Sequence, residues 1–123
     1  MTTDEQQEPS ARDDAGAMTV WRAAEVPLPL EPVPGATSDQ AAGSTDLGAF
    51  GDGTFGVWAI TEGVSADVEV DEVSVVLEGR GTGEDLDTGA TVELAAGTVL
   101  RLAAGTRTRW TVSEPIRKAY VVR

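Results

Sequence analysis

The feature that most constrains this chain is a series of short apolar, β-branched segments separated by glycine-containing turns between residues 55 and 122. The segments are residues 55–61, 65–70, 73–77, 81–86, 90–94, 99–102, 108–112 and 116–122. Short strands at intervals of about 8–12 residues, with no helical period, predict an antiparallel β-barrel or jelly roll. We therefore expect an all-β fold of one domain, whose barrel interior is the site of any ligand.

The strand boundaries predict several turns, among them one at Glu62-Gly63 and a hairpin at Asp87-Thr88-Gly89. Residues 73–77 predict a buried strand that ends in a turn at 78–81, and residues 113–115 predict a turn before the last strand. Within 65–72 the even-numbered residues, from Ala66 to Glu72, share one face by parity. We expect that face to line the barrel interior, with Asp67 and Glu69 pointing outward.

The N-terminal part is less regular. Residues 1–17 are polar and acidic and predict a disordered tail. Residues 18–53 predict an extended arm and loop, in which Trp21 either forms a short strand or attaches to the barrel and any other strand is short. Prolines at positions 27, 29, 32 and 34 favour polyproline-like chain. This arm is either a stiff segment along the domain or a ligand for a proline-recognition domain, and the barrel itself would span residues 54–123.

Composition excludes several classes of function. The chain has 21 acidic and 9 basic residues, a net charge of -12 that repels nucleic-acid phosphates. It has no histidine and no cysteine, which excludes disulfides, imidazole or thiolate metal ligands and a Ser-His-Asp triad. No segment approaches the ~20 apolar residues of a membrane-spanning helix, and no signal peptide is evident. We expect a cytoplasmic protein with no nucleic-acid or membrane partner.

The order and spacing of several residues resemble the first motif of the cupin superfamily. Gly63 matches its opening glycine, Glu72 its glutamate, and Val76-Leu77-Glu78-Gly79 follows at the usual interval. The two histidines of that motif fall on or near Ala66 and Val68. Neither of these residues can bind a metal.

The second cupin motif is also incomplete. Gly97 and Gly105 match its glycines, but its proline is Ala103 and its histidine is Thr108. Three of the four usual metal ligands are therefore absent, and Glu72 is the remaining one. The resemblance thus implies a cupin without a metal cofactor, with a divalent metal held at Glu72 as the alternative.

Further segments resemble one branch of the superfamily, which groups ureidoglycine aminohydrolase-like and ethanolamine-utilisation cupins with many small bacterial proteins. They are Gly56-Val57-Trp58, Trp110-Thr111-Val112 and Arg117-Lys118-Ala119-Tyr120. The acid expected after the strand tryptophan is Ala59 here. This resemblance implies an RmlC-like jelly roll and a homodimer.

The predicted ligand pocket combines the motif positions with aromatic and basic residues of the last strands. Its members are Trp58, Ala66, Val68, Glu72, Arg101, Thr108, Trp110 and Tyr120. Desolvation would raise the pKa of Glu72 unless Arg101, Arg107 or Arg109 pairs with it. Such a pair either binds a small polar or anionic molecule or is purely structural. The aromatic side chains either line a ligand cavity or fill the core.

Three hypotheses follow. The first is a non-catalytic cupin that binds a small molecule or acts as a dimeric interaction module. The second is a ureidoglycine aminohydrolase-like or isomerase-like enzyme, acting on a small polar metabolite with Glu72 as acid/base or as a carboxylate metal ligand. The third is a structural protein whose N-terminal arm and tail engage another chain.

Overall fold

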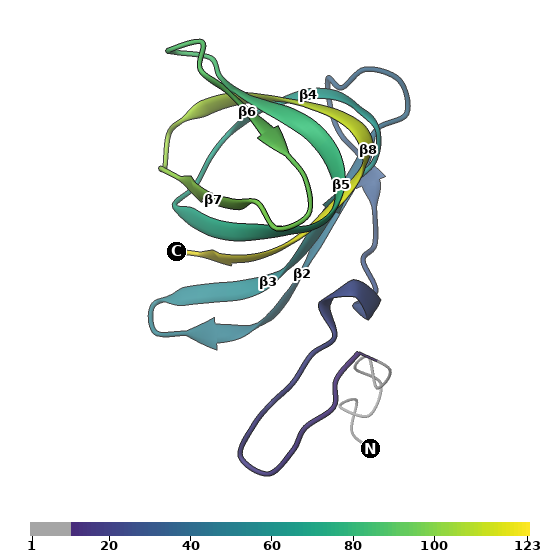
Figure 1. Cartoon of the computed structure of the whole chain (residues 1–123), viewed down its shortest axis with the longest axis vertical. Coiled ribbons are helices and arrows are strands. Elements are labelled where there is room, and N and C mark those ends of the chain that lie inside the picture. Colours follow the sequence, from purple (N-terminus) through teal and green to yellow (C-terminus); the bar gives the residue numbers. More distant parts are fainter. Residues whose placement is uncertain (1–10) are drawn as a thin grey trace.

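Two long paired strands, β5 (Glu72–Asp85) and β8 (Arg107–Val122), organise the fold in the computed structural model, which describes residues 11–123. They run antiparallel and side by side around the barrel wall (Figure 1). The strands β3 (Gly53–Ile60) and β4 (Gly63–Val68) pair with opposite ends of β8. The strands β6 (Thr91–Leu94) and β7 (Val99–Leu102) pair with opposite ends of β5.

The remaining strands extend the sheet beyond β3. These are β2 (Ala41–Phe50), which pairs with β3, and the short edge strand β1 (Glu31–Pro32). All eight strands pair antiparallel, which confirms the all-β prediction. Within residues 11–123 the one helical element is a 3₁₀ turn at Ala23–Glu25, and no helix is long and apolar enough to cross a membrane.

Two of the predicted turns, at 78–81 and 113–115, are wrong. Both segments lie inside long strands and face each other, with Arg80 opposite Glu114 and shifts of register between Val76 and Gly81. Gly79 has a φ of 98°, and a Cβ at this position would lie 2.1 Å from the carbonyl oxygen of Pro115. Gly79 and Gly81 on β5 and Pro115 on β8 therefore lie at bulges. The two strands bend at these bulges and continue beyond them.

The strand β2 is ten residues long where only a short strand was expected. Its sequence is rich in alanine, glycine and serine, which have low β-propensity. It nevertheless pairs with β3 from Ala42 opposite Ile60 to Phe50 opposite Gly53, with one irregularity between Asp46 and Gly48. Pairing with β3 therefore outweighs the low β-propensity of this segment. As a result, residues 41–50, which the sequence analysis assigned to the arm and loop, belong to the sheet.

The N-terminal arm packs on the outer face of its own barrel. Trp21 meets Phe55 edge-on, with ring centroids 5.5 Å apart, as its predicted attachment to the barrel requires. Ala11 and Val26 are buried against Val57 of β3. The predicted disordered tail falls mainly on residues 1–10, outside the described residues, whereas residues 11–17 form bridged turns with the segment that follows.

The core fills only part of the barrel interior. Its buried residues come from β3, β5, β6 and β8 and pack into one cluster: Ile60, Val76, Leu94, Val112 and Ile116. The same five residues form one wall of an internal cavity. The fold thus leaves a space in the barrel whose floor is apolar.

Candidate functional site

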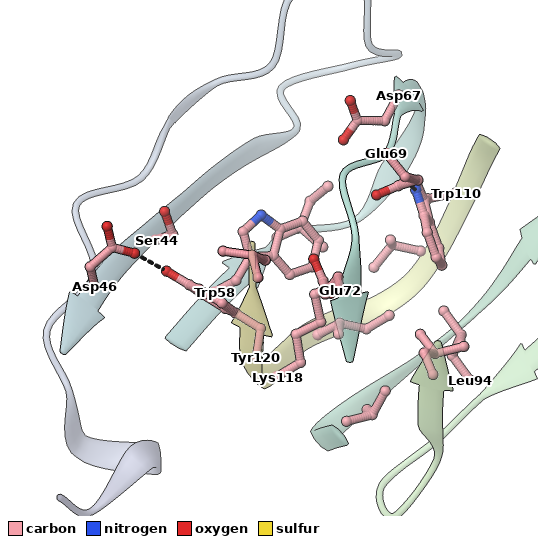
Figure 2. A pocket seen from close by; sticks show the side chains of 16 residues that line it. Ser44, Asp46, Trp58, Asp67, Glu69, Glu72, Leu94, Trp110, Lys118 and Tyr120 are labelled. Carbon is pink, nitrogen blue, oxygen red and sulfur yellow. Dashed lines mark hydrogen bonds and ion pairs between the residues drawn. The ribbon is translucent and has the colours of Figure 1, made fainter. Parts of the chain in front are cut away.

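The cavity has a volume of ≈ 270 Å³ and combines apolar, aromatic and charged side chains. Beyond the core cluster, its apolar wall adds Leu100 and Val122. The other lining residues are the aromatic Trp58, Trp110 and Tyr120 and the polar or charged Ser44, Asp46, Asp67, Glu69, Glu72 and Lys118. Figure 2 shows that charged and aromatic side chains from β2, β3, β5 and β8 converge on this space.

An ion pair between Lys118 and Glu72 crosses the barrel wall from β8 to β5. The Lys118 Nζ lies 2.5 Å from the Glu72 Oε2, and each side chain is 10% exposed. The same ammonium lies 4.7 Å from the ring centroid of Trp58 and 5.8 Å from that of Trp110. Ring faces attract a cation, so the two tryptophans and the carboxylate together balance a charge that is mostly removed from water.

Glu69 follows β4 directly and is buried, 9% exposed. Its Oε2 accepts hydrogen bonds from Thr108 Oγ1 at 2.6 Å and from Trp110 Nε1 at 3.1 Å. Burial raises the pKa of Glu69 above its usual value, and these two hydrogen bonds oppose the rise. Figure 2 shows its carboxyl group beside Trp110 and directed into the cavity.

Tyr120 and Asp46 line the side of the cavity that lies next to β2. The Tyr120 hydroxyl donates a hydrogen bond of 2.6 Å to Asp46 Oδ1. Burial, followed by this hydrogen bond, raises the pKa of Tyr120 to about 12, so the hydroxyl keeps its proton at neutral pH. Asp46 and Ser44 are exposed and line the cavity, so they lie where it opens to solvent on the β2 side.

Trp110 reaches its position because the residue opposite it is a glycine. Gly83 on β5 pairs with Trp110 on β8. A Cβ on Gly83 would lie 2.7 Å from Trp110 Cζ3. The missing side chain therefore makes room for the indole ring against β5, with the indole N–H directed at Glu69.

The structure brings four of the predicted pocket residues together around the cavity: Trp58, Glu72, Trp110 and Tyr120. Thr108 is buried and takes part through its hydrogen bond to Glu69. The predicted apolar wall is wrong, because Ala66 is exposed and Val68 is 63% exposed.

The prediction failed because it assumed that even-numbered residues share one face from Ala66 through to Glu72. The strand β4 ends at Val68 and β5 begins at Glu72, so an irregular connection separates the two elements. The alternation of faces holds only within a regular strand and does not carry across this connection. Consequently Asp67 and Glu69 line the cavity together with Glu72, although sequence parity placed them on opposite faces.

None of the three arginines proposed as partners of Glu72 lies in the cavity. Arg101 pairs with Asp71 at 3.6 Å, Arg107 with Asp87, and Arg109 with Glu84 at 3.1 Å, each pair on the exposed surface. Lys118 takes this place instead. Lys118 lies two residues from both Ile116 and Tyr120, so all three share one face of the last strand. This shared face was the signal that could have identified Lys118.

The metal site of a typical cupin does not fit this chain. Ala66 and Val68 face outward, Thr108 is hydrogen-bonded to Glu69, and Glu72 is neutralised by the Lys118 ammonium. Across residues 11–123, no group of three or more Asp or Glu side chains is arranged to hold a metal ion. The side chains at the four usual ligand positions therefore do not supply the donor set that a cupin metal requires.

Solved structures with the same fold include two proteins linked by name to ethanolamine utilisation. The EutQ protein of Clostridium difficile superposes with a TM-score of 0.71 and 17% sequence identity, covering 90% of this chain and 91% of that one. A putative ethanolamine utilization protein Q from Salmonella typhimurium gives a TM-score of 0.63 and 22% identity, covering 85% of each chain. A Rhizobium leguminosarum protein of unknown function gives 0.60 and 26%, covering 66% of this chain and 79% of that one.

At the level of sequence, no protein of curated function matches the chain. The EutQ-like cupin domain, in contrast, matches residues 47–120, which include β3 to β7 and most of β8. The match covers more than half of the chain and agrees with the eight-stranded fold and with the cupin resemblance of the motifs. The chain therefore belongs to the EutQ-like cupin domain family.

Proposed function

We propose that this cupin domain binds a small polar molecule in its barrel cavity without transforming it. The observation that carries the proposal is the partly desolvated set of Glu69, Glu72 and Lys118 around a space that the core leaves unfilled. Ligand sites are typically concave and largely apolar, with a few polar groups that fix orientation. The volume of ≈ 270 Å³ lies just below the range of about 300–1,000 Å³ for drug-sized ligands, which favours a metabolite-sized molecule.

A thermal-shift screen of small polar metabolites tests this function. A ligand that binds the folded state adds RT ln(1 + [L]/Kd) to the free energy of unfolding and therefore raises the melting temperature. Ser44→Trp should abolish the shift, because Ser44 lies at the opening and a large side chain would obstruct it. Ala49→Trp, on the same strand but outside the cavity lining, is the matched control and should retain the shift. A shift that survives Ser44→Trp would place binding elsewhere.

We also propose that the chain forms a homodimer through the outer face of the barrel. Val73, Val99 and Val121, from β5, β7 and β8, are 49%, 69% and 43% exposed and border a groove that also includes Phe50. No side chain lining this groove is charged at neutral pH. A second copy of a chain with net charge -12 can therefore dock here without bringing carboxylates together.

Light scattering coupled to size-exclusion chromatography tests the dimer. We expect twice the chain mass of 12.8 kDa for the parent and a monomer for Val99→Glu, since two acids would then face each other across the interface. Val92→Glu, at an exposed valine outside the groove, should remain dimeric. A monomeric parent protein would contradict the proposal.

An acid/base enzyme is the second candidate function, and the raised pKa of Glu69 favours it. Perturbed carboxyl groups in cavities are often catalytic. Glu72 is held by Lys118, so Glu69 is the better proton donor of the two. Incubating the ligands from the screen with the protein and following them by NMR tests this function. Turnover that is lost in Glu69→Gln would establish an enzyme, and unchanged ligand would support binding alone.

The cytoplasmic location of the protein stays a prediction.

A further inference from the structure

The charge of the cavity limits the class of its ligand, given that the cavity is the binding site proposed above. Four carboxyl groups line it, from Asp46, Asp67, Glu69 and Glu72, against the single ammonium of Lys118. With all five ionised, four negative charges and one positive charge leave a net charge of -3. No arginine contributes to the lining. An anionic ligand would thus enter a negative field in a chain that is itself strongly acidic.

The cavity already solvates one ammonium group with its own side chains. Lys118 Nζ is held between the Glu72 carboxylate and the faces of Trp58 and Trp110. These are the groups that replace water around an organic cation in protein sites. The lysine, however, uses only one of the four carboxyl groups.

Several acceptor atoms remain for a ligand. The side-chain hydrogen bonds among the described residues use Oε2 of Glu69, Oε2 of Glu72 and Oδ1 of Asp46. The second oxygen of each of these carboxyl groups has no side-chain donor within residues 11–123. A primary ammonium carries three N–H donors and matches such a set of acceptors, whereas a quaternary ammonium carries none.

We propose that the cavity binds a small aliphatic primary amine in its ammonium form. Glu69 accepts a hydrogen bond from the ammonium group, and the aliphatic part of the ligand lies against the core wall formed by residues such as Val76 and Leu94. Glu69 is a binding residue whose Oε2 is fixed by Thr108 and Trp110, which leaves Oε1 for the ligand. This ligand class rests on the proposed function, but it adds a separate prediction, namely that the cavity prefers a positively charged ligand to a neutral or negative one.

Four probes with the same four-carbon chain separate charge from shape. They are n-butylammonium, n-butyltrimethylammonium, 1-butanol and butyrate, each titrated against the protein while tryptophan fluorescence is followed. Two of the three tryptophans line the cavity, so occupancy should change the emission. We expect n-butylammonium to bind at least tenfold more tightly than the other three, because it alone offers both charge and N–H donors.

Variants show whether the carboxyl groups cause that preference. Glu69→Gln should weaken n-butylammonium binding about tenfold, as expected for the loss of a charge-assisted hydrogen bond, and Asp46→Asn should weaken it less, because Asp46 contributes only its negative charge. Glu93→Gln makes the same change of charge at an exposed site outside the cavity and should leave the affinity unchanged. Because Glu69 lies in the connection after β4 and Asp46 lies on β2, misfolding of one variant would not account for a weaker affinity in both.

Two outcomes would overturn the proposal, and they differ in what they imply for the proposed function. If butyrate or 1-butanol binds as tightly as n-butylammonium and Ser44→Trp blocks it, the cavity is a ligand site but not an amine site. If no probe binds and the metabolite screen is also negative, both the amine class and the binding function are wrong.

Discussion

Among single residues, Glu69 combines burial with two donors that hold one of its oxygens. Because its pKa is raised in the folded chain, the folded state retains this proton more strongly than the unfolded state does. The resulting contribution to stability is fully present below the ordinary value of 4.5 and is lost as the pH rises through the folded-state pKa. At neutral pH the burial of this acid therefore costs stability, which is typical of a group kept for a purpose other than folding.

Glu69→Gln should remove this pH dependence. A glutamine oxygen can still accept from Thr108 and Trp110, but the side chain no longer titrates. We expect the free energy of unfolding of the variant to rise relative to the parent as the pH increases from 4.5 to 8. Urea denaturation at several pH values measures the difference. A constant or falling difference would show that Glu69 has an ordinary or lowered pKa.

The Lys118–Glu72 pair makes a second prediction at this scale. Lys118→Met leaves Glu72 as a largely buried charge without a partner and should cost about 3 kcal/mol of stability. The double variant Lys118→Met/Glu72→Gln should recover most of the loss, since the uncompensated charge is then gone. Arg109→Met breaks the exposed pair with Glu84 and should cost less than about 1 kcal/mol. Equal losses for Lys118→Met and Arg109→Met would contradict the buried pair.

At the scale of elements, the bulged middle of β5 and β8 determines how the barrel closes. Gly79→Ala should be strongly destabilising, because both the positive φ and the 2.1 Å approach to the Pro115 carbonyl oxygen oppose a side chain. Gly89→Ala is the matched control, since its φ is 80° but a Cβ there meets nothing within 4 Å. We expect about 1–2 kcal/mol for the control from φ alone and at least about 2 kcal/mol more for Gly79→Ala. Denaturant unfolding of the two variants measures this difference, and equal costs would argue against the close contact.

The same bulges explain what could be predicted from the sequence. Alternation and glycine spacing identified most strands and the all-β fold, because these are local properties of strands and turns. A glycine-rich bulge has the same local sequence as a turn, so the continuity of β5 through Gly79 and of β8 through Pro115 depends on pairing between segments far apart in the chain.

The residues that line the cavity could be predicted only in part, because local sequence signals do not show how distant segments pack together. The aromatic residues follow from their positions on predicted strands, and Glu72 follows from the cupin resemblance. Glu69 and Asp67 could not be placed, because the connection between β4 and β5 resets the parity. The partner of Glu72 could not be chosen from sequence either, since the last strands carry several basic residues and only the packed barrel directs Lys118 inward.

For the whole molecule, the arm covers part of an apolar outer face that the barrel alone would expose. Val26 of the arm and Val57 of β3 are 1% and 0% exposed, and Arg117 Nη1 donates hydrogen bonds of 2.9 and 3.0 Å to the carbonyl oxygens of Ala23 and Val26. Val26→Ala should lower the free energy of unfolding by about 2 kcal/mol.

Leu30→Ala is the control for the arm. It removes more atoms, but Leu30 is 42% exposed, so we expect a loss within about 0.5 kcal/mol. Chemical denaturation of both variants in the full chain gives the comparison. If Val26→Ala costs no more than Leu30→Ala, the arm does not pack on the barrel as described.

The central claim, that the cavity is the ligand site, is tested most directly by the indole N–H signals of the three tryptophans. Trp58 and Trp110 line the cavity, whereas Trp21 packs on Phe55 at the outer face. On titration with n-butylammonium, followed by NMR, we expect the indole signals of Trp110 and Trp58 to move to saturation while that of Trp21 stays fixed. Movement of Trp21 alone, or of none of the three with n-butylammonium and with every ligand from the metabolite screen, would contradict a binding site in the barrel.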